Sequence, residues 1–187
     1  MRKIFYFMIL LCICPVVLAS DHIVYKDNVG ILLPSNYCDI TDQPMGLFVQ
    51  ESFEAAFQPL EIIVQRRTVL LVMEPCDNYD DMYSLGVLSM HEIRDHHIDT
   101  QKEHNQVMQK NPHLVILHAD DQVIVYHSRY QHGTVDVTSE TLIDGYWYDM
   151  RLSFDQADSS DFDYSDITSY LVANAKYMHA NYKSSHH

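Results

Sequence analysis

The stretch HLVILHADDQVIVYHSRYQHGTVDVTSETLIDGYWYDMRLSF, residues 113–154, decides the fold, because it predicts four antiparallel strands joined by three short turns. Val, Ile, Tyr and Thr dominate the predicted strands, and these side chains pack well on a pleated surface. The turns are predicted at 119–121, 131–133 and 143–145, where Asp and Gly supply the backbone conformations that hairpins need. The stretch is therefore a structural scaffold.

The last predicted strand, 146–154, alternates between two kinds of side chain. Because successive residues of a strand point to opposite faces of the sheet, one set faces the core. We expect the other set, which includes the only Trp of the chain, to face water or a partner protein. The core set is Tyr146, Tyr148, Met150, Leu152 and Phe154, and the opposite set is Trp147, Asp149, Arg151 and Ser153.

Further elements are predicted on both sides of this stretch. Apolar and helical periodicities predict short strands at 22–25 and 29–33, either a strand or a helix at 45–57, either a strand or a hairpin at 61–73, and a long helix at 81–110. A final helix is predicted to run to about Tyr182, with Ser165 or Asp163 as its cap. The fold class is α+β, with an antiparallel sheet of about six or seven strands, a C-terminal meander, a central helix and a C-terminal helix.

The first nineteen residues have the pattern of a secretory signal peptide. Arg2 and Lys3 precede the apolar run 4–18, and small or β-branched residues lead up to Ala19. The run is shorter than the roughly 20 apolar residues that cross a membrane. We therefore expect cleavage before Ser20, a single α+β domain at 20–187, and a periplasmic or secreted location.

Two of the four cysteines, Cys12 and Cys14, lie within the predicted signal peptide. In an exported chain the remaining pair, Cys38 and Cys76, most simply forms one disulfide. The alternative, a nucleophilic thiol, is disfavoured because neighbouring acids raise a thiol pKa.

The charge of the chain is strongly acidic. After loss of Arg2 and Lys3, 10 basic residues stand against 26 acidic ones, which gives a mature net charge of 10 − 26 = −16. Such a charge argues against binding nucleic acid or an anionic membrane surface. It favours a basic protein partner.

The order of predicted elements resembles that of a known family. The pattern VGILLP at 29–34, an inner helix, a meander whose last strand begins Gly145-Tyr146-Trp147-Tyr148 and a closing helix together resemble the Mog1/PsbP-like α/β/α sandwich. That resemblance implies a non-enzymatic binder, and some periplasmic toxin-immunity proteins are similar in size, export signal and acidity. It implies no catalytic residues.

One segment comes close to a metal-binding motif. A zinc protease needs His-Glu-x-x-His on one helix, but here His91 and Glu92 are followed by Asp95 and His96, so the second His is displaced. These four residues are candidate metal ligands, and the alternative is a solvated helix face with pairs four residues apart.

Acidic residues gather at 155–166, where Asp158, Asp161 and Asp163 are candidates for Ca²⁺ binding or for contact with a basic partner. The segment has neither the Gly nor the closing Glu of an EF-hand loop, and an ordinary acidic linker is the alternative. No resident cofactor is predicted, with Ca²⁺ and Zn²⁺ as the only metals that the residues suggest.

These observations lead to two hypotheses of function. The first is a non-enzymatic exported protein-binding module, such as an immunity or inhibitor protein that neutralises a toxin or enzyme through an acidic surface. Its candidate interface is Trp147, Asp149, Arg151, Asp158, Asp161 and Asp163. The alternative is a metal-binding protein or metal-dependent hydrolase that uses His91, Glu92, Asp95 and His96.

Overall fold

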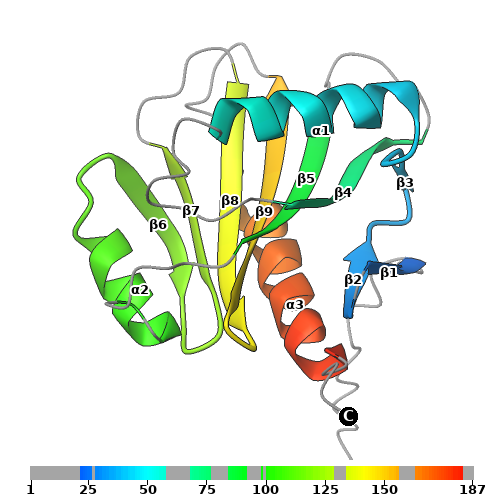
Figure 1. Cartoon of the computed structure of the whole chain (residues 1–187). Helices are drawn as coiled ribbons and strands as arrows, with labels where there is room; N and C mark the ends of the chain where they lie inside the picture. Colours follow the sequence, from blue (N-terminus) through cyan, green and yellow to red (C-terminus); the bar gives the residue numbers. More distant parts are fainter. Residues whose placement is uncertain are drawn as a thin grey trace, which may run out of the picture.

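A computed structural model describes residues 22–26, 28–57, 68–76, 84–91, 98, 100–128, 134–155 and 163–182. Within these residues the fold is α+β, with a seven-stranded antiparallel sheet, a two-stranded sheet and three helices (Figure 1). The strands are β1 (His22–Lys26), β2 (Val29–Leu33), β3 (Tyr37–Asp39), β4 (Thr68–Pro75), β5 (Ser84–His91), β6 (Leu114–Ala119), β7 (Ile124–Ser128), β8 (Thr134–Ile143) and β9 (Tyr146–Asp155), and the helices are α1 (Pro44–Phe57), α2 (Gln101–Gln109) and α3 (Ser165–Asn181).

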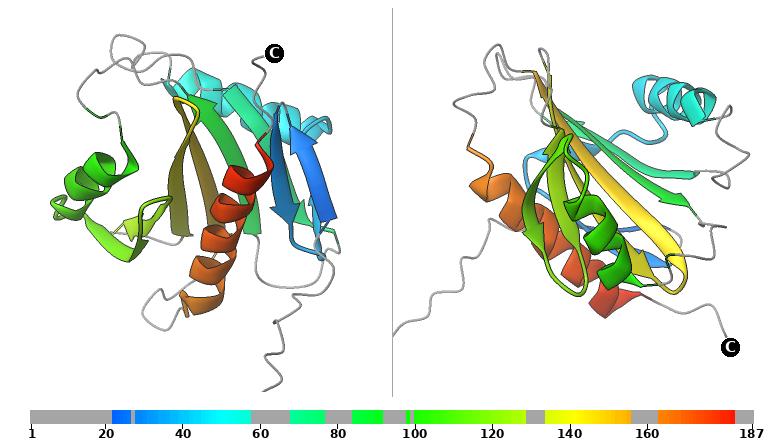
Figure 2. Two further views of the ribbon diagram at one scale, coloured as in Figure 1. Left: turned by 90° about the horizontal axis from the view of Figure 1, so that it is seen from below. Right: turned by 90° about the vertical axis from the view of Figure 1, so that its left-hand side faces the viewer.

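The large sheet has the strand order β3-β4-β5-β9-β8-β7-β6, so β9 lies at its centre. Helix α3 and the β1–β2 sheet lie on one side, which we call the back face, and α1 and α2 lie on the other, which we call the front face (Figures 1 and 2). None of the helices in the described residues is long and apolar enough to span a membrane.

The back face carries the main hydrophobic core. Leu71 on β4, Leu88 on β5 and Met150 on β9 are paired across the strands and are at most 2% exposed. Because directly opposite residues project to the same face, these side chains form a continuous apolar row. Helix α3 covers the row with Leu171, Ala175 and Met178, each at most 2% exposed.

A buried amide joins the small sheet to α3. Asn174 is 1% exposed, and its Oδ1 accepts a hydrogen bond from the backbone N–H of Leu32 on β2 at 3.1 Å. The hydroxyl of Tyr170, one turn earlier, donates to the Leu32 carbonyl at 2.7 Å. The edge of β2 is thus satisfied by α3, which fixes the small sheet against the back face.

On the front face α1 packs over β4 and β5. Its inner side chains Val49 and Phe53 contact a second apolar cluster that includes Val72 and Val87. Gly46 allows close approach at the start of the helix, because a Cβ there would lie 1.9 Å from the carbonyl oxygen of Ile40. The contact fixes which side of α1 faces inward.

The meander predicted at 113–154 is confirmed as β6 to β9, each antiparallel to the next strand in the sequence. Its last turn places Asp144 and Gly145 at φ values of 51° and 83°, in the left-handed region that Gly and Asp tolerate. The final helix is confirmed as α3, but its N-cap is Tyr164 and not the predicted Ser165 or Asp163. Asp163 Oδ1 accepts a hydrogen bond from the backbone N–H of Ser165 at the start of the helix. The short N-terminal strands are confirmed as β1 and β2.

The long helix predicted at 81–110 is wrong in its first half. Ser84–His91 forms strand β5, and the helix within the described residues of this segment is α2, Gln101–Gln109. Strand β5 packs on both faces, with Val87 in front and Leu88 behind, and such a strand has a continuous apolar run that periodicity cannot distinguish from a buried helix.

Two further predicted segments lie wholly or partly within the described residues. The segment 45–57, predicted as either a strand or a helix, is helix α1. The segment predicted at 61–73 corresponds to β4 from Thr68 onward, and its earlier part lies outside the described residues. The predicted signal peptide, 1–19, also lies outside them.

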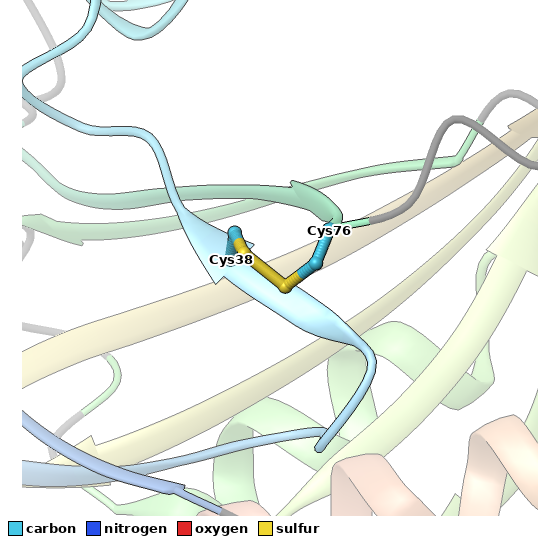
Figure 3. Close-up of a disulfide and its surroundings, with 2 residues drawn as sticks. All are labelled: Cys38 and Cys76. Atoms are coloured by element: carbon cyan, nitrogen blue, oxygen red, sulfur yellow. A yellow bond between two sulfur atoms is a disulfide. The ribbon is translucent and has the colours of Figure 1, made fainter.

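The disulfide between Cys38 and Cys76 is confirmed (Figure 3). Cys38 lies in edge strand β3 and Cys76 directly follows β4, with their Cα atoms 4.9 Å apart. The bond therefore fastens the edge strand to its neighbour and encloses helix α1 in the covalent loop.

Removing this bond should destabilise the fold measurably. The loop contains 76 − 38 − 1 = 37 intervening residues, so the chain-entropy treatment gives a loss of about 3–4 kcal/mol in the free energy of unfolding for the double substitution C38S/C76S. Urea denaturation of the double variant and the wild type, each with and without reductant, measures this loss. Reductant should lower the wild type to the level of the variant, and equal stability of the oxidised proteins would contradict the prediction.

Candidate functional site

The front face of the central strands is apolar beneath α1 and becomes polar beside α2, whereas the back face is apolar. Strand register places Ser89 on β5, Asp149 on β9 and Glu140 on β8 in one row. His91 and Trp147 form the next row. Because residues paired across strands share a face, these side chains all project toward the layer that contains α1 and α2.

One histidine–carboxylate pair joins α2 to this face. His104 Nε2 on α2 hydrogen bonds to Glu140 Oε2, and the Tyr126 hydroxyl on β7 donates to the other carboxylate oxygen at 2.7 Å. The His104 and Glu140 side chains are only 12% and 14% exposed. Both oxygens of a mostly buried carboxylate are therefore satisfied by groups from two other elements.

A second pair lies beside the first. His91 Nδ1 at the end of β5 is 3.3 Å from Asp149 Oδ2 on β9, and both side chains are at most 8% exposed. The two pairs also influence each other electrostatically, because His91 lowers the pKa of Glu140 and Asp149 raises the pKa of Tyr126. We call the five residues His91, His104, Tyr126, Glu140 and Asp149 the histidine–carboxylate cluster.

Helix α2 is attached to the sheet mainly by polar contacts. The Gln101 side chain donates to the Glu140 carbonyl at 3.2 Å and accepts from the Leu142 N–H at 2.9 Å, so it extends the hydrogen bonding of β8. Asn105 donates to the Asp120 carbonyl at 2.6 Å. The His104 ring also packs on Trp147, with ring centroids 4.2 Å apart.

The local sequence explains why this short helix forms. Thr100 is the N-cap: its hydroxyl accepts a hydrogen bond from the Glu103 N–H at 3.2 Å and contacts the Glu103 carboxylate at 3.0 Å. Gln101, His104 and Asn105 are spaced three and four residues apart, so they share the inner side of the helix. A polar inner side binds a polar sheet face.

The pKa of the Glu140 carboxyl reflects these contacts. Burial alone would raise this pKa, but the hydrogen bond and charge of His104, the Tyr126 hydroxyl and the charge of His91 together hold it below its ordinary value of 4.5. The pKa of the Tyr126 hydroxyl is raised, first by burial and then by the negative charge of Glu140. Glu140 is therefore ionised and Tyr126 is protonated at neutral pH.

Only one of the four predicted metal ligands, His91, lies within the described residues. His91 lies on strand β5, so it does not belong to the helix on which the metal motif was predicted. Glu92, Asp95 and His96 lie outside the described residues. Among the residues that the structure describes, no group of three or more His, Cys, Asp and Glu side chains is arranged to hold a metal ion.

The predicted interface is partly wrong. Trp147 is 2% exposed and Asp149 is 6% exposed, so neither side chain faces solvent. The reason is α2, which lies over this end of the front face and places His104 on the Trp147 ring. Arg151 and Asp163 are exposed as expected, and Asp158 and Asp161 lie outside the described residues.

Sequence reasoning missed His104, Tyr126 and Glu140. Tyr126 and Glu140 lie on strands predicted correctly, but nothing in the sequence indicates that their side chains share a partner. The spacing of Gln101, His104 and Asn105 is a signal that a polar helix face is buried.

Comparison with known proteins finds no matching family model, no similar curated protein and no similar solved structure. The site therefore has to be interpreted from its own geometry.

Loss of the His104 side chain should be costly. In the substitution H104A the Glu140 charge stays mostly buried without its His104 partner, so the free energy of unfolding should fall by about 3 kcal/mol. Gln106, exposed on the same helix, provides the control Q106A, which should change stability by about 0.5 kcal/mol or less. Urea denaturation measures both, and a double substitution H104A/E140Q should recover part of the loss. Equal effects of H104A and Q106A would contradict the role assigned to the pair.

The depressed pKa of Glu140 predicts a specific pH dependence. A carboxyl whose pKa is lower in the folded protein contributes stability above its unfolded value of 4.5, and that contribution is lost as pH falls through the folded pKa. The free energy of unfolding of the wild type should therefore fall on acidification below about pH 4.5, and that of E140Q should fall less steeply. Urea titrations at several pH values from neutral to acid measure the two slopes, and parallel slopes would contradict the prediction.

Proposed function

We propose that this protein is an exported protein-binding module of the immunity or inhibitor type, which neutralises a basic toxin or enzyme through its acidic surface. The observation that carries the proposal is the position of the charged groups. The histidine–carboxylate cluster lies beneath the surface and is used to attach α2, whereas acidic side chains project into solvent.

The exposed side chains of the described residues carry a net negative charge, as the whole chain does. Exposed carboxylates outnumber exposed Lys and Arg side chains by seven to four among the described residues. The carboxylates are Asp42, Glu51, Glu103, Asp121, Asp144, Asp163 and Asp166, and the cations are Lys102, Lys110, Arg151 and Lys176. Such a surface attracts a basic partner over a distance set by the Debye length, and the attraction weakens as salt is added.

The disulfide supports the proposed location. A bond between Cys38 and Cys76 persists in oxidising compartments such as the periplasm or the extracellular space, and is rare in a reducing cytosol. A predicted signal peptide at 1–19 points to the same route of export.

The proposal predicts a single partner that is bound in a salt-dependent way. Residues 20–187, immobilised and exposed to envelope and culture-fluid proteins of the source cell, should retain one basic protein at low salt and release it at high salt. The purified partner should bind in a 1:1 complex whose dissociation constant rises about tenfold or more when the salt concentration is raised from 50 to 500 mM. Binding should also inhibit the activity of the partner.

The proper control is an unrelated exported protein of similar size and net charge, which should not retain the partner. If no protein is retained specifically, or if the retained protein binds equally well at both salt concentrations, the proposed function is wrong.

A further inference from the structure

Helix α1 exposes an unusual amount of apolar surface. Met45, Leu47 and Phe48 are 48%, 49% and 64% exposed, and they lie within four residues of one another. Isolated apolar side chains on a surface are ordinary, but adjacent large ones mark interaction sites. Three of the seven large apolar residues that are exposed in the described chain therefore belong to one helical turn.

Packing of α1 on the sheet does not require these side chains. The helix contacts the front-face core through Val49 and Phe53, and Gly46 sits tightly against the Ile40 carbonyl. Phe48 lies on the opposite side of the helix from Gly46, since two residues advance the helix by about 200°. The exposed set therefore faces away from the sheet, and the helix that carries it lies across the front face (Figures 1 and 2).

On α1 and the turn that precedes it, the described charged side chains are all acidic. Asp42 in the preceding turn and Glu51 on the helix are exposed, and the sequence 35–57 contains no Lys, Arg or His. The exposed cations of the described chain lie on other elements: Lys102 at α2, Lys110 at its end, Arg151 on β9 and Lys176 on α3. The outward surface of α1 is therefore apolar at its centre and acidic at its margin.

We propose that this surface, formed by Met45, Leu47, Phe48 and Glu51 of α1 together with Asp42, is the docking site for the partner protein, which presents an apolar groove edged by Lys and Arg. The inference rests on the proposed function and names the surface that performs it. An amphipathic helix that enters such a groove is a common mode of recognition, with anchors spaced like Met45 and Phe48. A second copy of the chain fits less well, because two copies would bring the same acidic margins together.

A photo-crosslinking amino acid at position 48 tests the surface directly. The matched control is the same amino acid at position 107, because Val107 on α2 is also an exposed apolar residue, at 52%. Irradiation in envelope and culture-fluid extract should give an adduct at position 48 with the protein that the immobilised wild type retains, and no such adduct at position 107. Mass spectrometry identifies the adduct.

Affinity for the purified partner provides the quantitative test. The substitution F48E should raise the dissociation constant by at least about thirtyfold, as expected for the loss of a central aromatic anchor, and V107E should change it less than about threefold. Both variants place a charge at a position that is already exposed, so their urea denaturation curves should match that of the wild type. An unfolded F48E protein is replaced in the test by F48S.

The outcomes separate the two proposals. If a partner is retained but its adduct forms at position 107 and not at 48, or if F48E and F48S bind it normally, the α1 surface is wrong and the proposed function stands. An adduct at position 48 with a second copy of the chain or with lipid also overturns the surface. If no protein is retained and neither position gives an adduct, both proposals fall.

Discussion

Strand β9 lies at the centre of the seven-stranded sheet, so both of its faces must be covered without leaving its polar groups unsatisfied. Because its side chains alternate between the two faces, each face of β9 is covered in a different way. On the back, Tyr148, Met150 and Leu152 join the core beneath α3 and the small sheet. On the front, Trp147 and Asp149 face a layer in which histidines and carboxylates compensate one another. The layered architecture follows from the need to cover the apolar back face of β9 and its polar front face with different elements.

The polar cover depends chiefly on Glu140. A carboxylate in a low-dielectric setting is costly unless it is paired and hydrogen bonded, and Glu140 receives a bond from His104 and another from Tyr126. Since His104 belongs to α2, the same contact that stabilises the charge also docks the helix. A helix with Gln, His and Asn on its inner side gains little from an apolar surface, so the register of α2 is set by hydrogen bonds. The pairing of His104 with Glu140 thus determines where α2 sits on the sheet.

The sequence predicts elements well where one local pattern has one explanation. The meander alternates clearly and carries Asp and Gly at its turns, and the stripe of Leu171, Ala175 and Met178 defines the buried side of α3. Strand β5 was mistaken for helix because it is apolar on both faces, which removes the period that tells the two apart. Trp147 was expected outside because alternation gives the face of a residue but not what covers it. His104 and Glu140 are 36 residues apart, and only the tertiary structure brings them together.

The two helices of the front face use opposite chemistry, and this contrast bears on function. Polar side chains of α2 point inward and form hydrogen bonds that attach the helix to the sheet. In contrast, Phe48 and its apolar neighbours on α1 are exposed, so they contribute little to the stability of the fold. Phe48 is not among the described residues of either hydrophobic cluster, and Val49, Phe53 and Gly46 hold α1 against the sheet independently of that side chain. A surface supported in this way can change its side chains without loss of stability. That separation suits a binding protein, because its recognition surface can adapt to a partner while the histidine–carboxylate cluster and the back-face core keep the scaffold constant.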